Sequence, residues 1–273
     1  LAAALALWLG PGLPPSLAGL KEFGAYFVLL AGAGVSLWFN RGRAFVAAMS
    51  LLLAYAGYRY ALGFGAESFA ARAVYTAVVV LVPLNVLAAL LLPERGVSYH
   101  GDYRWLFIAA AEILLAAWIA SSGRSSLSGA AWQELLENWL LRSPPAPFLG
   151  RVLFCAAFTA AVWRAWPRHS PLDIGIAGAL AAFFIACEWS GETSFGVFTA
   201  AAGAILVVAM LQESYRLAFH DELTGLPGRR ALQEAMAGLG PHYAIAMADV
   251  DHFKSFNDTH GHDIGDQVLK LVA

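Results

Sequence analysis

Long apolar stretches recur through most of this chain, and they limit what it can fold into. Seven of them lie at residues 23–39, 44–64, 69–92, 105–120, 148–166, 172–189 and 195–211. A helix needs about 20 mostly apolar residues to cross the hydrocarbon of a bilayer, because each residue adds about 1.5 Å. Inside lipid, every backbone polar group must be bonded within the protein. The pattern therefore predicts an α-helical multi-pass membrane bundle of about seven helices over residues 1–211.

The composition also indicates a membrane protein. Apolar residues make up 59% of the chain and charged residues 13%, against about 45–50% and 25% in soluble domains. The net charge of -2, without a basic run, argues against nucleic acid as a partner and leaves the lipid bilayer. Cys155 and Cys187 fall within apolar stretches, so we expect buried free thiols. Residues 1–9 are apolar but too short to span, and we interpret them as the remnant of an eighth span or of a signal sequence.

Basic residues in the short loops predict the orientation of the bundle. If the C-terminus is cytoplasmic, the cytoplasmic side receives Arg41, Arg43, Arg95, Arg104, Arg164, Arg168 and Arg216. The opposite side receives a smaller set spread over longer connections, namely Lys21, Arg72, Arg124, Arg142 and Arg151. This bias predicts a cytoplasmic C-terminal segment.

Three polar features interrupt the apolar pattern. In the connection 121–147, apolar residues recur at helical spacing, at Trp132, Leu135, Leu136, Trp139 and Leu140. They predict an amphipathic helix that lies at the headgroup boundary or faces a ligand. Glu112 and Arg59 fall within spans, where ionisable groups are costly and often functional. Alternatively, Arg59 extends toward a helix end and Glu112 forms a hydrogen bond inside the bundle.

The last part of the chain is different and carries two polar blocks. The first reads DELTGLPGRR at residues 221–230, and the second reads ADVDHFKSFNDTHGHDIGDQ at residues 248–267. Asp249 and Asp251 are at strand spacing, which places both carboxylates on one face and suits a hard divalent cation. Lys254 follows as a point charge suited to phosphate.

Periodicity predicts several short elements around these blocks. Residues 212–220 contain no Pro or Gly and should continue the last span as a short helical linker. After Pro227, residues 229–239 have an apolar helical stripe. Residues 242–250 are short and apolar, which predicts a buried strand with Asp249 at its carboxyl end, a common ligand position. Residues 253–260 and 265–273 should be helices.

Both blocks resemble the first half of the GGDEF domain, the catalytic domain of diguanylate cyclases. The resemblance rests on D-x-L-T-G-L, R-R, D-x-D-x-F-K-x-x-N-D and G-H-x-x-G-D-x-x-L. It implies that residues 221–273 form the N-terminal part of an α/β ferredoxin-like, nucleotidyl-cyclase-like domain. Gly228 departs from the family, which usually has Asn there. The G-G-[DE]-E-F turn is not reached by Ala273, and the chain begins at Leu1, so we expect a fragment truncated at both ends and inactive alone.

The resemblance also implies an activity and its residues. A bacterial inner-membrane homodimer would condense two GTP to cyclic di-GMP and two pyrophosphates, with the spans as an input module of unknown signal. Asp249 and the carbonyl of Val250 would hold Mg²⁺ or Mn²⁺. Lys254 would contact the terminal phosphates with the amides of His252 and Phe253. Asn257 and Asp266 would bond guanine, and His262 would pack beside it.

Several residues allow a second interpretation. Asp251 is a second metal ligand or a structural partner. Asp221 is expected to brace the fold, by an ion pair with Arg229 or Arg230, rather than to touch substrate. His260 and His262 are two residues apart and do not share a helix face, which argues against zinc.

Two other functions compete with the cyclase. A degenerate GGDEF domain would bind GTP and have a regulatory role, alone or ahead of a phosphodiesterase domain. A non-enzymatic membrane transport or scaffold protein would use the soluble part for assembly, although no repeated half indicates a transporter.

Overall fold

The computed structural model describes residues 18–63, 65, 68–94, 96–97, 104–122, 147–168, 170–189, 192–221 and 223–273. The chain divides into two compact units, Leu1–Leu211 and Gln212–Ala273, and each is described by itself. The apolar residues 1–9 and the expected amphipathic helix at residues 132–140 lie outside the described part.

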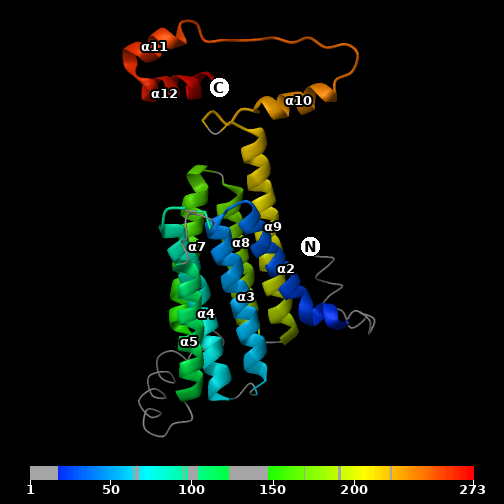
Figure 1. Ribbon diagram of the computed structural model, residues 1–273, viewed down its shortest axis with the longest axis vertical. Coiled ribbons are helices and arrows are strands. Elements are labelled where there is room, and N and C mark those ends of the chain that lie inside the picture. Colours follow the sequence, from blue (N-terminus) through cyan, green and yellow to red (C-terminus); the bar gives the residue numbers. More distant parts are fainter. Residues whose placement is uncertain are drawn as a thin grey trace. The chain divides into compact units, whose positions relative to one another are not determined.

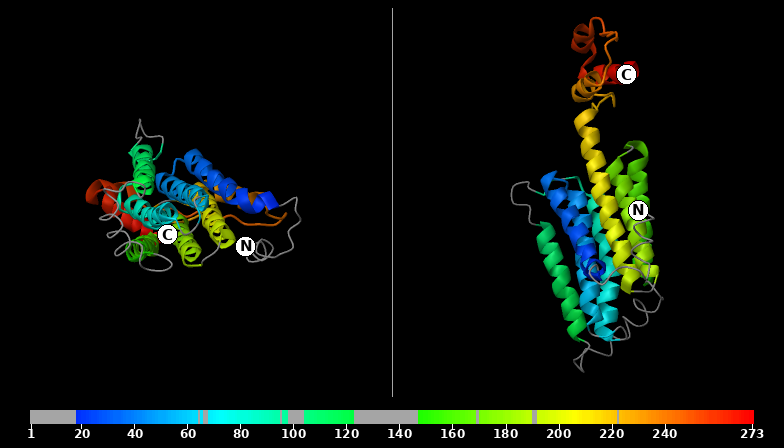
Figure 2. Two further views of the ribbon diagram at one scale, coloured as in Figure 1. Left: turned by 90° about the horizontal axis from the view of Figure 1, so that it is seen from below. Right: turned by 90° about the vertical axis from the view of Figure 1, so that its right-hand side faces the viewer.

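The described part of the first unit is built from helices, and each of the seven apolar stretches overlaps one of them. They are α2 (Ala18–Trp38), α3 (Gly42–Leu62), α4 (Phe69–Leu91), α5 (Arg104–Ser122), α7 (Phe148–Arg168), α8 (Pro171–Glu188) and α9 (Glu192–Phe219). Figures 1 and 2 show them running side by side as a bundle. Along the bundle α3 packs on α2 and α4, α4 also packs on α5 and α7, and α7 packs on α8.

Among the described residues, five helices are long and apolar enough to cross a membrane, fewer than the seven spans predicted. They comprise Gly42–Leu62, Ala70–Leu91, Phe148–Trp166, Pro171–Glu188 and Ser194–Phe219. The apolar parts of α2 and α5 are shorter, Phe23–Trp38 and Phe107–Trp118. At about 1.5 Å per residue they extend about 24 and 18 Å, less than the roughly 30 Å of a hydrocarbon core. The structure therefore supports five spans by length and composition.

Large apolar side chains also cover the outside of the bundle. Trp163 and Trp166 of α7 are 79% and 80% exposed, and Phe107 of α5 is 72% exposed. An exposed apolar surface of this kind is typical of a membrane-facing protein. Cys155 lies on this exposed surface, which corrects the prediction that it is buried, whereas Cys187 is buried; both are free. Because lipid is as apolar as a protein core, an apolar stretch alone does not tell which of its side chains face inward.

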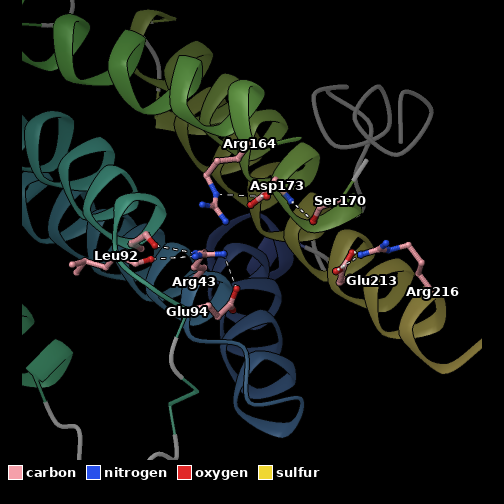
Figure 3. A network of polar contacts seen from close by, with 9 residues as sticks. Arg43, Leu92, Glu94, Arg164, Ser170, Asp173, Glu213 and Arg216 are labelled. Carbon is pink, nitrogen blue, oxygen red and sulfur yellow. Dashed lines mark hydrogen bonds and ion pairs between the residues drawn. The ribbon is translucent and has the colours of Figure 1, made fainter. Parts of the chain in front are cut away.

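Two of the basic residues assigned to the cytoplasmic side contact the C-terminal end of α4 and the N-terminal end of α8. Arg43 of α3 donates to the carbonyl oxygens of Ala89 and Leu92, both at 3.1 Å, and pairs with Glu94 at 2.9 Å (Figure 3). It thereby satisfies the unpaired carbonyls with which every helix ends. Arg164 of α7 lies 3.7 Å from the buried Asp173.

The N-terminal end of α8 is capped by a side chain. The Oγ atom of Ser170 accepts a hydrogen bond of 3.3 Å from the backbone N–H of Asp173. Asp173 is also the acidic residue of the first turn of α8, where a negative charge interacts favourably with the helix dipole. The capped and charged first turn explains why α8 begins at Pro171.

The close approach of α9 to its neighbours depends on glycine. Gly203 of α9 faces Leu29 of α2, and a Cβ atom added at Gly203 would lie 2.8 Å from Leu29 Cδ2. Gly175 of α8 faces Ala209 of α9 so closely that an added Cβ would overlap the alanine methyl group. Small residues allow helices in lipid to gain van der Waals contact between backbones. Glycine therefore sets the spacing of α9 from α2 and α8.

In its described residues, the second unit contains three short helices after the end of α9. They are α10 (Arg229–Ala237), α11 (Phe253–His260) and α12 (His262–Val272), and α11 packs on α12. All three were predicted, although α12 begins at His262 rather than at residue 265. Gly261, with φ +86°, joins α11 directly to α12.

The predicted strand at residues 242–250 is not formed. The segment has no regular secondary structure, and Tyr243, Ile245 and Met247 are 58%, 64% and 96% exposed. A strand obtains its backbone hydrogen bonds from neighbouring strands, and the only pairing among the described residues is an isolated bridge between His220 and Pro227. The helical half of the prediction is therefore confirmed, whereas the α/β sheet is not shown.

Gly175→Ala should destabilise the bundle by about 1–3 kcal/mol, because the new methyl group forces α8 and α9 apart. Gly34→Ala is the matched control, since a Cβ atom there meets nothing within 4 Å. Thermal unfolding of the two purified variants in one detergent measures the difference. Equal unfolding midpoints for the two variants would contradict the role assigned to Gly175.

Candidate functional site

The block D-E-L-T-G-L-P-G folds into a turn that is stabilised by Asp221. Its Oδ2 atom accepts hydrogen bonds from the backbone N–H groups of Leu223 at 3.2 Å and Thr224 at 2.8 Å. The Thr224 hydroxyl donates to the same oxygen at 2.8 Å. Gly225 adopts φ +74°, a conformation that glycine reaches without strain, and its N–H donates to the Asp221 carbonyl at 3.0 Å. These bonds define an Asx-type turn.

The turn also closes a short loop between α9 and α10. The N–H of Gly228 donates to the carbonyl of Phe219 at 2.6 Å, and the N–H of Asp221 donates to Leu226 at 2.9 Å. Asp221 thus braces the fold as predicted, but it does so by accepting hydrogen bonds within the turn and not by an ion pair. No ion pair joins it to Arg229 or Arg230 in the described part of the chain.

Hydrogen bonds from Thr224, first its backbone N–H and then its hydroxyl, hold the pKa of the Asp221 carboxyl below its ordinary value of 3.8. A depressed pKa in the folded state means that the ionised carboxylate stabilises the turn above pH 3.8. That contribution is lost as the pH falls below this value.

A pocket of about 410 Å³ lies beside this turn in the second unit. Its lining includes Arg216, His220 and Asp221. None of the residues predicted to hold substrate or metal belongs to this lining. The pocket is therefore not the predicted nucleotide site.

The residues predicted to hold metal and phosphate lie where the irregular segment meets α11. The Oδ1 atom of Asp249 accepts the N–H of Val250 at 2.9 Å. His252 adopts the left-handed conformation, with φ 56°, and α11 begins at the next residue without a side-chain cap. The first N–H groups of α11 thus lack a side-chain acceptor, and a helix N-terminus favours anions. Lys254, in this first turn, is exposed.

These donors fit a hard divalent cation. Asp249 is exposed, and among the described residues its Oδ2 atom has no hydrogen-bond partner. A carboxylate oxygen and the Val250 carbonyl are ligands that Mg²⁺ prefers. Asp251 is also exposed and makes no hydrogen bond within the described ranges, so the structure assigns it no partner.

Asn257 and Asp266, predicted to read the base, come from the facing helices α11 and α12. Gly265 is buried, and a Cβ atom added there would overlap the Asn257 side chain. Asp266 directly follows this glycine and is exposed. The Oδ1 atom of Asn257 is buried and has no hydrogen-bond partner among the described residues. A buried acceptor without a partner is costly and indicates a group that a ligand could satisfy.

The two glycines between these residues were not singled out from the sequence. Gly261 connects the helices, and its N–H donates to the Asn257 carbonyl at 2.8 Å. Gly265 lets α12 approach α11. The signal was present in the motif G-H-x-x-G-D, whose second glycine precedes the acidic residue.

The two histidines of the motif are placed differently. The ring of His260 stacks on Phe256, with centroids 4.5 Å apart, and its Nδ1 atom lies 3.2 Å from the Phe256 carbonyl oxygen. His262 is the exposed first residue of α12. The described part of the chain holds no group of three or more His, Cys, Asp or Glu side chains arranged around a common metal position.

Comparison with known proteins identifies this segment. Residues 218–273 match the family model described as diguanylate cyclase, GGDEF domain. Diguanylate cyclase DgcP of Pseudomonas aeruginosa is 41% identical over 70 residues, 23% of this chain and 10% of that protein. Diguanylate cyclase DgcZ of Escherichia coli is 47% identical over 58 residues, 19% of this chain and 20% of that protein. The C-terminal segment is therefore similar to the GGDEF domain over residues 218–273.

The same segment is also similar to part of a protein that is named as a phosphodiesterase. Cyclic di-GMP phosphodiesterase NbdA of Pseudomonas aeruginosa is 42% identical over 65 residues, 21% of this chain and 8% of that protein. The chain thus spans between 8% and 20% of the length of these three relatives. No solved structure matches the chain.

Asp221→Ala should open the turn, because the N–H groups of Leu223 and Thr224 and the Thr224 hydroxyl lose their common acceptor. We expect amide hydrogen exchange at Leu223 and Thr224 to accelerate by at least tenfold at neutral pH, measured by mass spectrometry of the whole chain. Asp258→Ala removes an exposed carboxylate from α11 and is the control. Unchanged exchange in Asp221→Ala would refute the bracing role.

Proposed function

We propose that this chain carries the membrane part and the first half of the catalytic domain of a diguanylate cyclase. Such an enzyme condenses two GTP to cyclic di-GMP and two pyrophosphates. The single observation that carries the proposal is the order of Asp249, Lys254, Asn257 and Asp266 within the segment that matches the GGDEF family. Each of these residue types suits one part of a Mg²⁺–GTP complex.

Asp249 and the Val250 carbonyl would hold Mg²⁺, which gathers phosphate charge and lowers the barrier to phosphoryl transfer. Lys254 and the backbone amides of His252 and Phe253 would bind the terminal phosphates. The uncapped N-terminus of α11 supports this assignment, because its unpaired N–H groups and dipole attract an anion. Asp249 and Lys254 are the proposed catalytic residues.

Asn257 and Asp266 would select guanine. The Asp266 carboxylate would accept from the N1 and N2 donors of the base, which adenine lacks. The contact of Gly265 with Asn257 supports this assignment, because it brings α11, which carries Asn257, against α12, which carries Asp266. His262, the first residue of α12, would pack beside the base.

The proposed cyclase is a homodimer in the bacterial inner membrane, with its C-terminal domain in the cytoplasm where GTP is available. Two facing subunits would each supply one GTP, and each 3'-hydroxyl would attack the α-phosphate of the other nucleotide. The first unit would act as an input module. The continuous helix α9, from Glu192 to Phe219, supports a mechanical link from the last span into residues 212–219.

A second candidate is a GGDEF domain that binds GTP and regulates without making product. The 42% identity to the phosphodiesterase NbdA favours keeping this possibility, because a segment of this kind occurs in a protein with that name. Measurement of GTP binding and of product formation, in a chain that continues through a complete GGDEF domain, distinguishes the candidates. Binding without product would favour the regulatory role.

Reporter fusions test the orientation. Alkaline phosphatase is active only in the periplasm. It should be silent when fused after Ala273 and active when fused after Trp189, which follows the C-terminal end of α8 on the expected periplasmic side. Green fluorescent protein at the same two positions should give the opposite pattern. Strong phosphatase activity at Ala273 would overturn both the orientation and the access to GTP.

Asp249→Ala, in a chain with a complete GGDEF domain, should reduce turnover with Mg²⁺ below detection, because the phosphate charge loses its metal site. Asp266→Ala should weaken GTP binding roughly tenfold to hundredfold, since unpaired guanine donors cost about 1–3 kcal/mol.

The controls are neighbouring carboxylates, Asp258→Ala for the metal site and Asp263→Ala for the base site. Turnover assays and competition between GTP and ATP measure the two effects. Normal turnover in Asp249→Ala would remove it from the metal site. Unchanged discrimination against ATP in Asp266→Ala would remove that carboxylate from base recognition.

A further inference from the structure

An apolar cavity of about 320 Å³ lies among α3, α4 and α5 in the first unit. Small or aliphatic side chains form most of its wall, including Gly57 of α3, Leu81 of α4 and Ala116 of α5. This volume lies within the range of pockets that hold small molecules.

A hydrogen-bonded polar pair lies in this wall, in addition to the hydroxyl groups of Ser50 and Tyr60. Asn85 of α4 donates its Nδ2–H to the Oε2 atom of Glu112 at 3.0 Å, and both residues line the cavity. Glu112 lies within Phe107–Trp118, the apolar part of α5. The bond confirms that Glu112 is bonded inside the bundle. It uses one carboxyl oxygen, however, and within the described residues the Oε1 atom has no hydrogen-bond partner.

We propose that this cavity binds a small apolar molecule that carries one hydrogen-bond donor, such as a phenol, an alcohol or an amine. The apolar wall would hold the body of the molecule, and the donor would bond the free oxygen of Glu112. Asn85 fixes the carboxyl through its other oxygen, so the acceptor is oriented before the ligand arrives. An ionisable group inside a membrane bundle commonly marks a ligand or ion site. The binding site is independent of the proposed cyclase activity.

The test compares two probes of similar size, 2-naphthol with a donor and naphthalene without one. The 273-residue chain in lipid nanodiscs is dialysed against each probe, and empty nanodiscs give the lipid background. After correction for this background, we expect the wild-type chain to prefer 2-naphthol by roughly tenfold, the effect of one hydrogen bond in an apolar site. Glu112→Leu should retain naphthalene and lose the preference.

Two variants fill the cavity from opposite walls. Ala116→Phe from α5 and Gly57→Leu from α3 should each remove at least nine-tenths of the binding of both probes. At Gly57 an added Cβ atom makes ordinary contacts with Val74 and Val78, at 3.4 and 3.5 Å, so the change is sterically admissible. Ala110→Phe makes the matched substitution at an exposed position of α5 outside the cavity lining and should bind as wild type.

The outcomes separate the proposal from its rivals. Equal retention of the two probes by the wild type, unaffected by Glu112→Leu, would indicate a groove filled by lipid chains and would overturn it. Binding no greater than in empty nanodiscs would also overturn it, as would wild-type binding in both filling variants. Circular dichroism and thermal unfolding check that each variant is folded.

Discussion

Pairing of the backbone N–H and C=O groups is the constraint on which both units depend. A helix satisfies these groups within its own segment, and so it forms wherever an apolar stretch is embedded in lipid. This is why each of the seven long apolar stretches overlaps a helix in the described part of the first unit. A strand instead needs a neighbour, and residues 242–250 have none among the described residues. The same chemistry thus fixes the helices locally and leaves residues 242–250 dependent on distant partners.

This difference explains what could be predicted from the sequence. Helix positions followed from apolar runs and periodicity, and α11 was predicted at its observed limits, Phe253–His260. The motif also placed Asn257 and Asp266 on successive helices. The prediction of a strand at residues 242–250 was wrong because the neighbouring strands that it would pair with are not specified by its own residues. The pairing of Asp221 with its turn was missed because an arginine is also an electrostatically reasonable partner, and only the backbone geometry distinguishes the two.

Contacts between helices were the least predictable features. Nothing in the order of residues says that Gly175 meets Ala209, or that Asn85 of α4 meets Glu112 of α5. Both contacts depend on how each helix is rotated about its axis and how far it is shifted along it. Apolar stretches specify this weakly, because lipid and the protein interior accommodate the same apolar side chains. The exposed Cys155 has the same cause. Small residues and isolated polar residues within apolar runs are therefore the positions that carry information about helix neighbours.

The uninterrupted α9 makes chain length itself a functional variable. Its 28 residues, from Glu192 to Phe219, form a rod of about 42 Å. Each residue inserted after the membrane-embedded part would turn the rest of the helix by about 100° about its own axis and lengthen it by about 1.5 Å. Insertion of one residue would therefore move residues 212–219 to other faces of the helix, whereas insertion of seven would nearly restore their faces. Natural length variation at this junction should accordingly come in steps that preserve the phase of the helix.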